Sequence, residues 1–200
     1  MQPKLWPSDE PARLLFVGEA RAKKGLALLL VAYRAVAAQR AAELVLVGGV
    51  RDGDDAAMIT LFQRHYPDLR LRIIAWVGQN ALREYYRQCT LLLLPSLHDG
   101  LPNALLEGMA CGCAVIGSAV GGMTDVVEDG VNGCLVPPGD ADALAEAIVR
   151  LLDAPERREE LGTKARETVV RKYTLEREHE RYREVYCAAV QSTGGNAHLV

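Results

Sequence analysis

Two carboxylates, Asp99 and Glu107, lie on either side of a predicted helix start, and their spacing is suited to chemistry on a charged substrate. The segment that carries them, residues 94–114, reads LPSLHDGLPNALLEGMACGCA. Pro102 and Asn103 are typical of a helix N-terminus, where unpaired backbone N–H groups and the helix dipole favour phosphate. Helical side chains lean toward the N-terminus, so we expect Glu107 to face the same pocket as Asp99.

Each acidic residue also has an ordinary structural interpretation. Asp99 is suited to shaping a turn, and Glu107 to a solvated helix surface near an N-terminus, where acids are common. Asp52, Gly53 and Asp54 have the spacing of a D-x-D metal motif. Asp and Gly are also what a turn followed by a helix requires, and we favour the turn. The sequence therefore predicts no metal site.

Alternating strands and helices must position these residues. The apolar run from Thr90 to Leu94 is typical of a strand buried on both faces of a parallel sheet. The other predicted strands lie at 13–18, 43–48, 70–77, 113–117 and 133–136. The predicted helices lie at 25–39, 56–65, 79–88, 103–112, 125–128, 140–153, 155–172 and from Leu175 onward. This alternation predicts an α/β fold, a doubly wound, Rossmann-like parallel sheet with helices on both faces.

Helix caps and chain ends complete the predicted organisation. Asp54 or Asp55 is expected to cap the second helix, Asp140 the helix at 140–153, and Thr174 the terminal helix. The terminal helix carries an apolar stripe, formed by Leu175, Tyr182, Val185, Tyr186 and Ala189. Residues 1–12 read as an irregular lead-in, 13–191 as one domain and 192–200 as a loose tail.

Composition excludes several classes of protein. The 200 residues are 50% hydrophobic and 24% charged with a net charge of -3, which is ordinary for a soluble globular domain. Basic residues are interspersed with acidic ones, so no nucleic-acid surface is expected. The longest apolar runs are too short to span a bilayer, and no signal-peptide pattern opens the chain. We expect a cytoplasmic location.

The five cysteines are odd in number and scattered through apolar segments. They are therefore expected to be buried, reduced thiols. Cys111 and Cys113 form C-x-C, which lacks zinc-site spacing. No G-x-G-x-x-G follows a strand, which argues against a nicotinamide-binding domain.

Three motifs in order resemble those of retaining glycosyltransferases of the two-domain GT-B fold, known as group 1 or family 4. HDGLPNALLEGMACG resembles the family's E-G-x-P-x-x-x-x-E-A-M-A-C-G, with Asp99 in place of the first Glu. FVGEARAKKG resembles G-R-x-x-x-x-K-G, with Glu19 in place of the Arg. GGMTDVVEDGVNGCLV is close to G-G-x-x-E-x-x-x-x-G-x-x-G-x-L-V. The resemblance covers roughly residues 13–190 and implies one half of a GT-B fold, the half that binds the donor.

The resemblance implies transfer of a sugar from a nucleoside-diphosphate sugar to a glycan, lipid or other acceptor, as in polysaccharide biosynthesis, without a metal or another cofactor. Lys24 and the start of the helix would hold the diphosphate, and Lys24 and Asp99 would be the catalytic residues. The positions assigned to the helix start are Asn103, Ala104 and Leu105.

The other implied roles concern the rest of the donor. Glu107 would accept hydrogen bonds from the ribose, and Asp99 would stabilise positive charge at the anomeric centre, with His98 in the same pocket. Gly18 would allow close backbone approach to the ligand, as would the Gly121-Gly122 turn. The nucleobase would lie around residues 76–78, contacted through backbone groups near Val77.

Glu19 departs from the family pattern in a way that affects phosphate binding. The usual Arg contacts the diphosphate, and a charge-assisted hydrogen bond is worth about 1.5–3 kcal/mol. Its loss corresponds to a decrease of roughly ten- to a hundredfold in binding affinity or reaction rate. Arg21 or Lys23 would have to substitute. The change from Glu to Asp99 also shortens that side chain by one methylene.

The resemblance leaves three hypotheses open. In the first, the chain is the donor half of a glycosyltransferase, either excised or in need of a partner, and lacks the N-terminal acceptor-binding domain; any membrane contact would be made through that missing half. In the second, it is a non-catalytic nucleotide-sugar-binding module. In the third, it is a GT-B sugar-nucleotide epimerase. The terminal apolar stripe is expected to be partly exposed in each.

Overall fold

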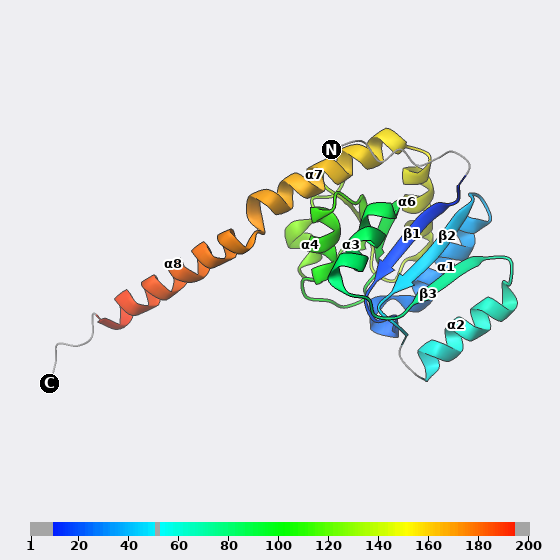
Figure 1. Ribbon diagram of the computed structural model, residues 1–200, viewed down its shortest axis with the longest axis horizontal. Helices are drawn as coiled ribbons and strands as arrows, with labels where there is room; N and C mark the ends of the chain where they lie inside the picture. Colours follow the sequence, from blue (N-terminus) through cyan, green and yellow to red (C-terminus); the bar gives the residue numbers. More distant parts are fainter. Residues whose placement is uncertain (1–9, 51–52, 195–200) are drawn as a thin grey trace.

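A six-stranded parallel sheet in the order β3-β2-β1-β4-β5-β6 forms the centre of the chain (Figure 1). The computed structural model describes residues 10–50 and 53–194. The strands are β1 (Ala12–Val17), β2 (Ala42–Val47), β3 (Arg70–Ile74), β4 (Leu91–Leu94), β5 (Val115–Ser118) and β6 (Cys134–Val136). The chain starts in the middle, builds outward to β3, and then returns to place β4 beside β1. The predicted doubly wound parallel sheet is confirmed.

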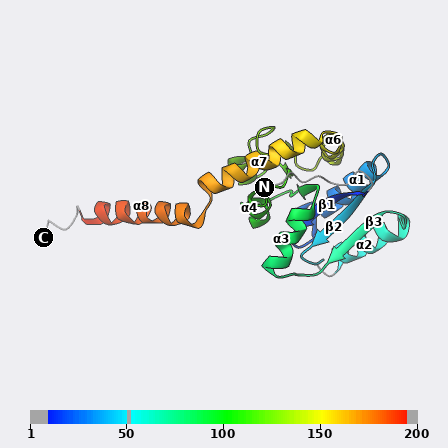
Figure 2. The same ribbon diagram turned by 45° about the horizontal axis from the view of Figure 1, so that its top comes forward.

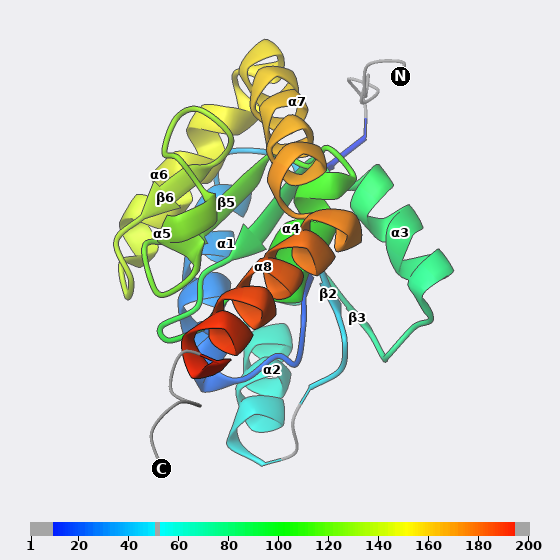
Figure 3. The ribbon, with the colours of Figure 1, turned by 90° about the vertical axis from the view of Figure 1, so that its left-hand side faces the viewer.

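Helices cover both faces of this sheet, as Figures 1 and 3 show. They are α1 (Leu26–Ala37), α2 (Asp54–His65), α3 (Gln79–Gln88), α4 (Asn103–Ala110), α5 (Met123–Val126), α6 (Ala141–Leu152), α7 (Pro155–Lys172) and α8 (Leu175–Gly194), with a 3-10 turn η1 (Ala22–Lys24). Strand residues alternate between two apolar cores, because successive side chains point to opposite faces. Leu14 and Phe16 join the core under α1, α2 and α6. Leu15 joins the core under α3, α4, α5 and α7.

The predicted caps of α6 and α8 are confirmed, and that of α2 is wrong. Asp140 accepts a 2.8 Å hydrogen bond from the Ala143 N–H, and Thr174 Oγ1 accepts one from the Arg177 N–H. Gly53, with φ 92°, is the N-cap of α2. Both predicted caps therefore lie inside its first turn, where a negative charge is still favourable to the helix dipole.

Strand β3 is shorter than predicted because its partner ends. The prediction ran to residue 77, whereas pairing with β2 stops at Val47 and Ile74. Gly48 and Gly49 then both direct their N–H groups at the Ile74 carbonyl, which closes the ladder. As an edge strand, β3 has no second neighbour to extend it.

The cysteines and the end of the chain also differ in part from expectation. Cys89, Cys113 and Cys134 are buried and reduced, whereas Cys111 is half-buried and Cys187 is exposed. Helix α8 continues through Gly194, into the segment assigned to a loose tail.

Helix α8 extends away from the α/β body (Figures 1 and 2). Its apolar stripe is exposed, as predicted, with Tyr182, Val185 and Tyr186 each more than half accessible at 58%, 66% and 68%. In the part of the chain that the structure describes, no helix combines the length and the apolar character needed to cross a membrane.

Candidate functional site

The loops that follow β1 and β4 meet where the direction of strand order reverses. These two strands are neighbours, yet α1 packs on one face of the sheet and α4 on the other. The two loops therefore lie at the carboxyl edge beside a topological switch point, the place where ligands bind in open α/β sheets. The loops span residues 18–25 and 95–102.

Lys24 and Asp99 form an ion pair across this junction. The Lys24 ammonium donates to Asp99 Oδ2, and the two side chains are only 21% and 14% exposed. The Ser96 hydroxyl donates to the same oxygen at 3.1 Å. Burial opposes ionisation of Asp99, but the hydrogen bond and charge of Lys24, with Ser96 and the Gly100 backbone N–H, outweigh it and lower the pKa of this carboxyl. Asp99 is therefore a carboxylate at neutral pH.

Backbone contacts hold the loop of Lys24 against the loop of Asp99. The Leu97 N–H donates to the Lys23 carbonyl at 3.0 Å. Gly25 adopts φ 78°, and a Cβ there would lie 1.9 Å from the Pro95 carbonyl oxygen. Only glycine fits this contact, so the K-G pair in the sequence is needed for the two loops to meet.

The Gly121-Gly122 turn supports the Asp99 loop from its other side. The Gly122 N–H donates to the Gly100 carbonyl at 3.0 Å. A Cβ at Gly121, which has φ 49°, would lie 1.9 Å from the Asp99 carbonyl oxygen. This turn was expected to admit a ligand. In the structure, the turn makes a close approach to the main chain of the Asp99 loop.

Helix α4 presents its N-terminus beside the same loop. The Leu105 N–H already donates to the Pro102 carbonyl at 3.0 Å, and the Leu105 side chain is fully buried. Asn103 is exposed and Ala104 half-buried, so they are the more accessible of the three predicted positions. Their N–H groups lie in the first turn, where no carbonyl of the helix can reach them.

Glu107 is held from α3 rather than by the residues of the ion pair. The Tyr86 hydroxyl donates to Glu107 Oε2 at 2.8 Å. Across the described ranges, no hydrogen bond or ion pair joins Glu107 or Val77 to Lys24 or Asp99. The structure therefore joins Lys24 to Asp99 directly, whereas Glu107 is bonded to Tyr86.

The remaining predicted residues follow strands at the carboxyl edge of the sheet. Gly18 has φ 135° and open space where a Cβ would lie, with Gly48 packed behind it. His98 is exposed and Val77 half-buried, while the neighbouring Trp76 is 82% exposed beyond the end of β3.

Glu19, the departure from the family pattern, is neutralised by a neighbour. Arg21 Nη1 lies 3.1 Å from Glu19 Oε2. The pairing offsets the repulsion that an acid would exert on phosphate. It also occupies Arg21, one of the two residues expected to replace the missing arginine. Lys23 is exposed, and among the described residues its side chain takes part in no ion pair.

Sequence reasoning did not single out Tyr86 or Ser96, although both donate to a predicted site carboxylate. Ser96 directly follows the Pro95 that ends β4, a position from which it reaches the loop. Tyr86 has no such signal, because a tyrosine on the inner face of an amphipathic helix is usually a core residue.

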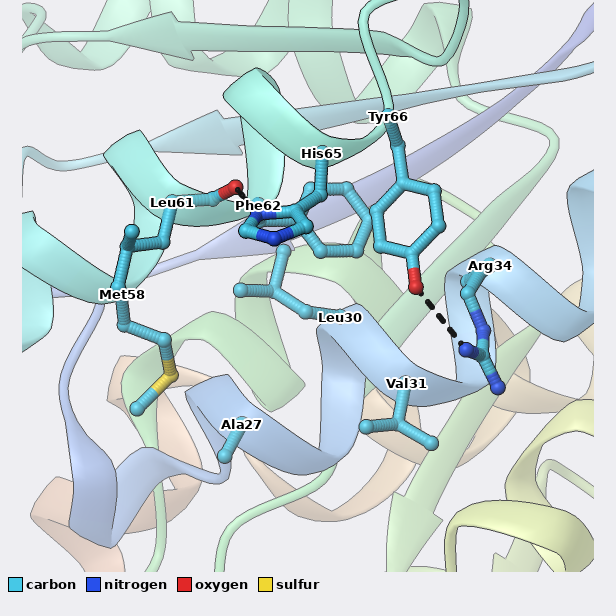
Figure 4. Close-up of a pocket in the computed structure, with 9 residues that line it drawn as sticks. All are labelled: Ala27, Leu30, Val31, Arg34, Met58, Leu61, Phe62, His65 and Tyr66. Carbon is cyan, nitrogen blue, oxygen red and sulfur yellow. Dashed lines mark hydrogen bonds between the residues drawn. The ribbon is translucent and has the colours of Figure 1, made fainter.

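A separate apolar pocket of about 300 Å³ lies between α1 and α2 (Figure 4). Its polar groups are already engaged: Arg34 donates to the Tyr66 hydroxyl at 3.0 Å, and His65 contacts the Leu61 carbonyl. None of the predicted site residues lines it. In the described parts of the chain, no cluster of three or more His, Cys, Asp or Glu residues is arranged to hold a metal, although Asp52 of the D-x-D triplet lies outside them.

Known proteins resemble this chain in sequence and in fold. A family model described as Glycosyl transferases group 1 matches residues 11–154. Alpha-maltose-1-phosphate synthase of Mycolicibacterium smegmatis is 32% identical over 182 residues, which are 86% of this chain and 46% of that protein. The structure of sucrose-phosphate synthase from Thermosynechococcus elongatus superposes with a TM-score of 0.79 and 33% identity, over 92% of this chain and 47% of that one.

Anabaena HepE, a more distant neighbour, has been solved with UDP and with UDP-glucose. Its UDP complex superposes with a TM-score of 0.82 at 18% identity, over 90% of this chain and 49% of HepE. At this identity the match shows the fold alone. These neighbours are GT-B proteins, and this chain spans about half the length of the relatives it matches.

Proposed function

The chain belongs to the group 1 glycosyl transferases, and from that premise we propose that it is the donor-binding half of a retaining, metal-independent glycosyltransferase. Its substrate would be a nucleoside-diphosphate sugar, whose sugar passes to a glycan, lipid or other acceptor. The observation that carries the proposal is the contact between Lys24 and Asp99 at the carboxyl edge of β1 and β4.

The contact matches the charge that develops in glycosyl transfer. When the donor bond breaks, negative charge builds on the leaving diphosphate oxygen and positive charge on the anomeric carbon to which it was bonded. Groups that stabilise these two charges must therefore be neighbours. Lys24 and the start of α4 would face the diphosphate, and Asp99 would face the anomeric carbon. A cation supplied by the protein can serve where other enzymes use a metal.

Glu107 would hold the ribose, with its accessible carboxylate accepting from the hydroxyl groups. The nucleobase would lie near Val77, beyond the end of β3. UDP is a reasonable first ligand, because HepE, of the same fold, has been solved with it. The relatives bear the names of glycosyltransferases and synthases, which favours transfer over the epimerase and the non-catalytic alternatives.

A second, acceptor-binding half would complete the enzyme. The chain spans about half of its relatives, and the apolar stripe of α8 is exposed. Without that half, the chain is expected to bind a nucleoside diphosphate but to transfer little sugar. Robust glycosylation of an acceptor by this chain alone would contradict this part of the proposal.

A thermal-shift screen tests the binding step. UDP-, GDP- and ADP-sugars are compared with and without chelator, and one of them is expected to raise the melting temperature equally in both conditions. Lys24→Ala should weaken the binding of that ligand by roughly tenfold or more, since it removes a charge-assisted hydrogen bond worth about 1.5–3 kcal/mol. Lys172→Ala, at an exposed position on α7, is the matched control. Equal affinity of the wild type and Lys24→Ala would refute the assignment of Lys24.

A further inference from the structure

Tyr86 is a residue of α3 whose hydroxyl reaches α4, and the two helices are neighbours in Figures 1 and 3. Its side chain is only 2% exposed, and its hydroxyl donates to Glu107 Oε2 at 2.8 Å. Among the described residues this is the hydrogen bond that holds the Glu107 carboxylate. A long, flexible glutamate on an exposed helix surface is thereby tied to a buried, rigid ring.

The main chain of Tyr86 is fixed as firmly as its hydroxyl. Its carbonyl oxygen accepts from the thiols of Cys89 and Cys113, at 3.3 and 3.1 Å. The Cys89 contact closes the end of α3 on itself, whereas Cys113 precedes β5, so the Cys113 contact links the end of α3 to the sheet. Sliding of α3 along the sheet would break the Cys113 contact. The phenol therefore has a fixed position relative to the carboxyl edge.

Gly108 sets the distance between the ring and α4. A Cβ at this position would lie 2.2 Å from Leu92 Cδ2 and 3.5 Å from Tyr86 Cε1. Glycine therefore lets α4 approach β4 and the tyrosine ring closely. The preceding residue is Glu107, so this close approach places its carboxylate within reach of the phenol.

The direction of the hydrogen bond follows from the environment of the phenol. Burial, and then the adjacent Glu107 carboxylate, raise the pKa of Tyr86 far above its usual value. The phenol keeps its proton at every physiological pH and acts as a donor. Glu107 must accept through Oε2, which leaves Oε1 for another donor.

We propose that Tyr86 is a positioning residue for nucleotide recognition, one that fixes Glu107 so that Oε1 accepts from the ribose hydroxyls. The inference rests on the proposed function, which assigns the ribose to Glu107. Preorganisation of this kind improves affinity because the side chain loses less freedom on binding. Tyr86 itself need not touch the nucleotide.

Tyr86→Phe tests the proposal, because it keeps the ring and removes the hydroxyl. Dissociation constants are measured by calorimetry for the tightest ligand among UDP, GDP and ADP, and for its 2′,3′-dideoxy counterpart. Tyr86→Phe should bind the ribonucleotide about five- to tenfold more weakly, the loss expected for part of a charged hydrogen bond. The dideoxy ligand, which lacks the hydroxyl groups, should change less than twofold. Tyr85→Phe is the control, because Tyr85 is a half-buried neighbour whose hydroxyl forms no hydrogen bond with the described residues.

The ratio of the two affinities separates positioning from a general structural role. A structural defect would weaken both ligands equally and would overturn the inference. A Tyr86→Phe variant that keeps the wild-type ratio would also overturn it, and would leave the proposed function intact. If the wild type bound none of the three diphosphates, the proposed function itself would fail. In the Glu107→Ala background, adding Tyr86→Phe should leave the ratio unchanged, and any further change would contradict a role exerted through Glu107.

Discussion

Asp99→Asn should bind a nucleoside diphosphate more tightly than the wild type, even though it removes a residue proposed to be catalytic. Asp99 is ionised and accepts from the Lys24 ammonium. A diphosphate must therefore compete with this carboxylate for the same cation. The substitution weakens the competitor and leaves the loop contacts of Gly25 and Gly121 in place.

The magnitude follows from the bond that is exchanged. A hydrogen bond between charged groups is worth about 1.5–3 kcal/mol and a neutral one about 0.5–1.5 kcal/mol. An asparagine can still accept from the Lys24 ammonium but supplies no opposite charge, so the substitution gives up at most about 1–1.5 kcal/mol of competition, or up to roughly five- to fifteenfold in affinity. Loss of the repulsion between Asp99 and the phosphates acts in the same direction.

Calorimetry with UDP, GDP and ADP at pH 7 measures the effect. Asp68→Asn is the matched control, since it makes the same change of charge at an exposed position before β3, at the opposite edge of the sheet. When the acceptor-binding half is supplied, Asp99→Asn should also lose sugar transfer. Tighter binding of the nucleoside diphosphate together with slower sugar transfer is the combination expected if Asp99 both competes for Lys24 and acts in transfer.

The opposite result would refute this reasoning. If Asp99→Asn folds like the wild type and binds the diphosphate more weakly, Asp99 orients Lys24 for phosphate rather than competing for it. Equal affinity would mean that Lys24 does not contact the diphosphate, and the proposed role of the ion pair would fail with it.

Three further predictions concern stability and association. Lys24→Met should lower the free energy of unfolding by about 1.5–3 kcal/mol at pH 7, because it leaves the Asp99 carboxylate buried without its cation. Since the pKa of Asp99 is lowered in the folded state, this stabilisation is present above the unfolded-state pKa of about 4 and is lost as pH falls through the folded-state value. Urea denaturation should therefore show the difference between wild type and Lys24→Met shrinking below about pH 4. Gly25→Ala should lower the melting temperature more than Gly139→Ala. Both glycines have left-handed φ values, 78° and 82°, but only a Cβ at residue 25 would lie against a backbone oxygen. Similar melting temperatures for the two variants would contradict the tight fit of the loops. The pair Tyr182→Ser and Tyr186→Ser should change the free energy of unfolding by less than about 0.5 kcal/mol, since both side chains are more than half exposed at 58% and 68%, and should reduce self-association in sedimentation experiments; a large loss of stability would mean that the stripe packs on this chain.

Local pattern was sufficient for most of the fold. Helix α3 has the bounds that periodicity predicts, Gln79–Gln88, and β4 lies within the predicted apolar run. Both signals depend on neighbouring residues alone, a repeat of apolar positions or a continuous apolar stretch. The alternation of strands and helices then fixes the class of sheet, because parallel strands need crossover connections.

The site was less predictable because its contacts are long-range. Lys24 and Asp99 are 75 residues apart, and their meeting depends on β1 and β4 being neighbours. No periodicity encodes that order. Family resemblance gave each residue a role but did not indicate that they pair. The early end of β3 has the same origin, since it depends on where the partner strand stops.

The glycines of the three motifs indicate what determines the position of Asp99. Gly25 accommodates the carbonyl of Pro95, and Gly121 accommodates the carbonyl of Asp99 itself. Two glycines from distant motifs therefore hold the main chain of one loop from opposite sides. The carboxylate of Asp99 is then placed by a closely held main chain and by its contact with Lys24. With the loop in this position, an aspartate side chain is long enough to reach the Lys24 ammonium. The motifs act together, and a substitution in the Gly121-Gly122 turn should disturb the ion pair as directly as one beside Lys24.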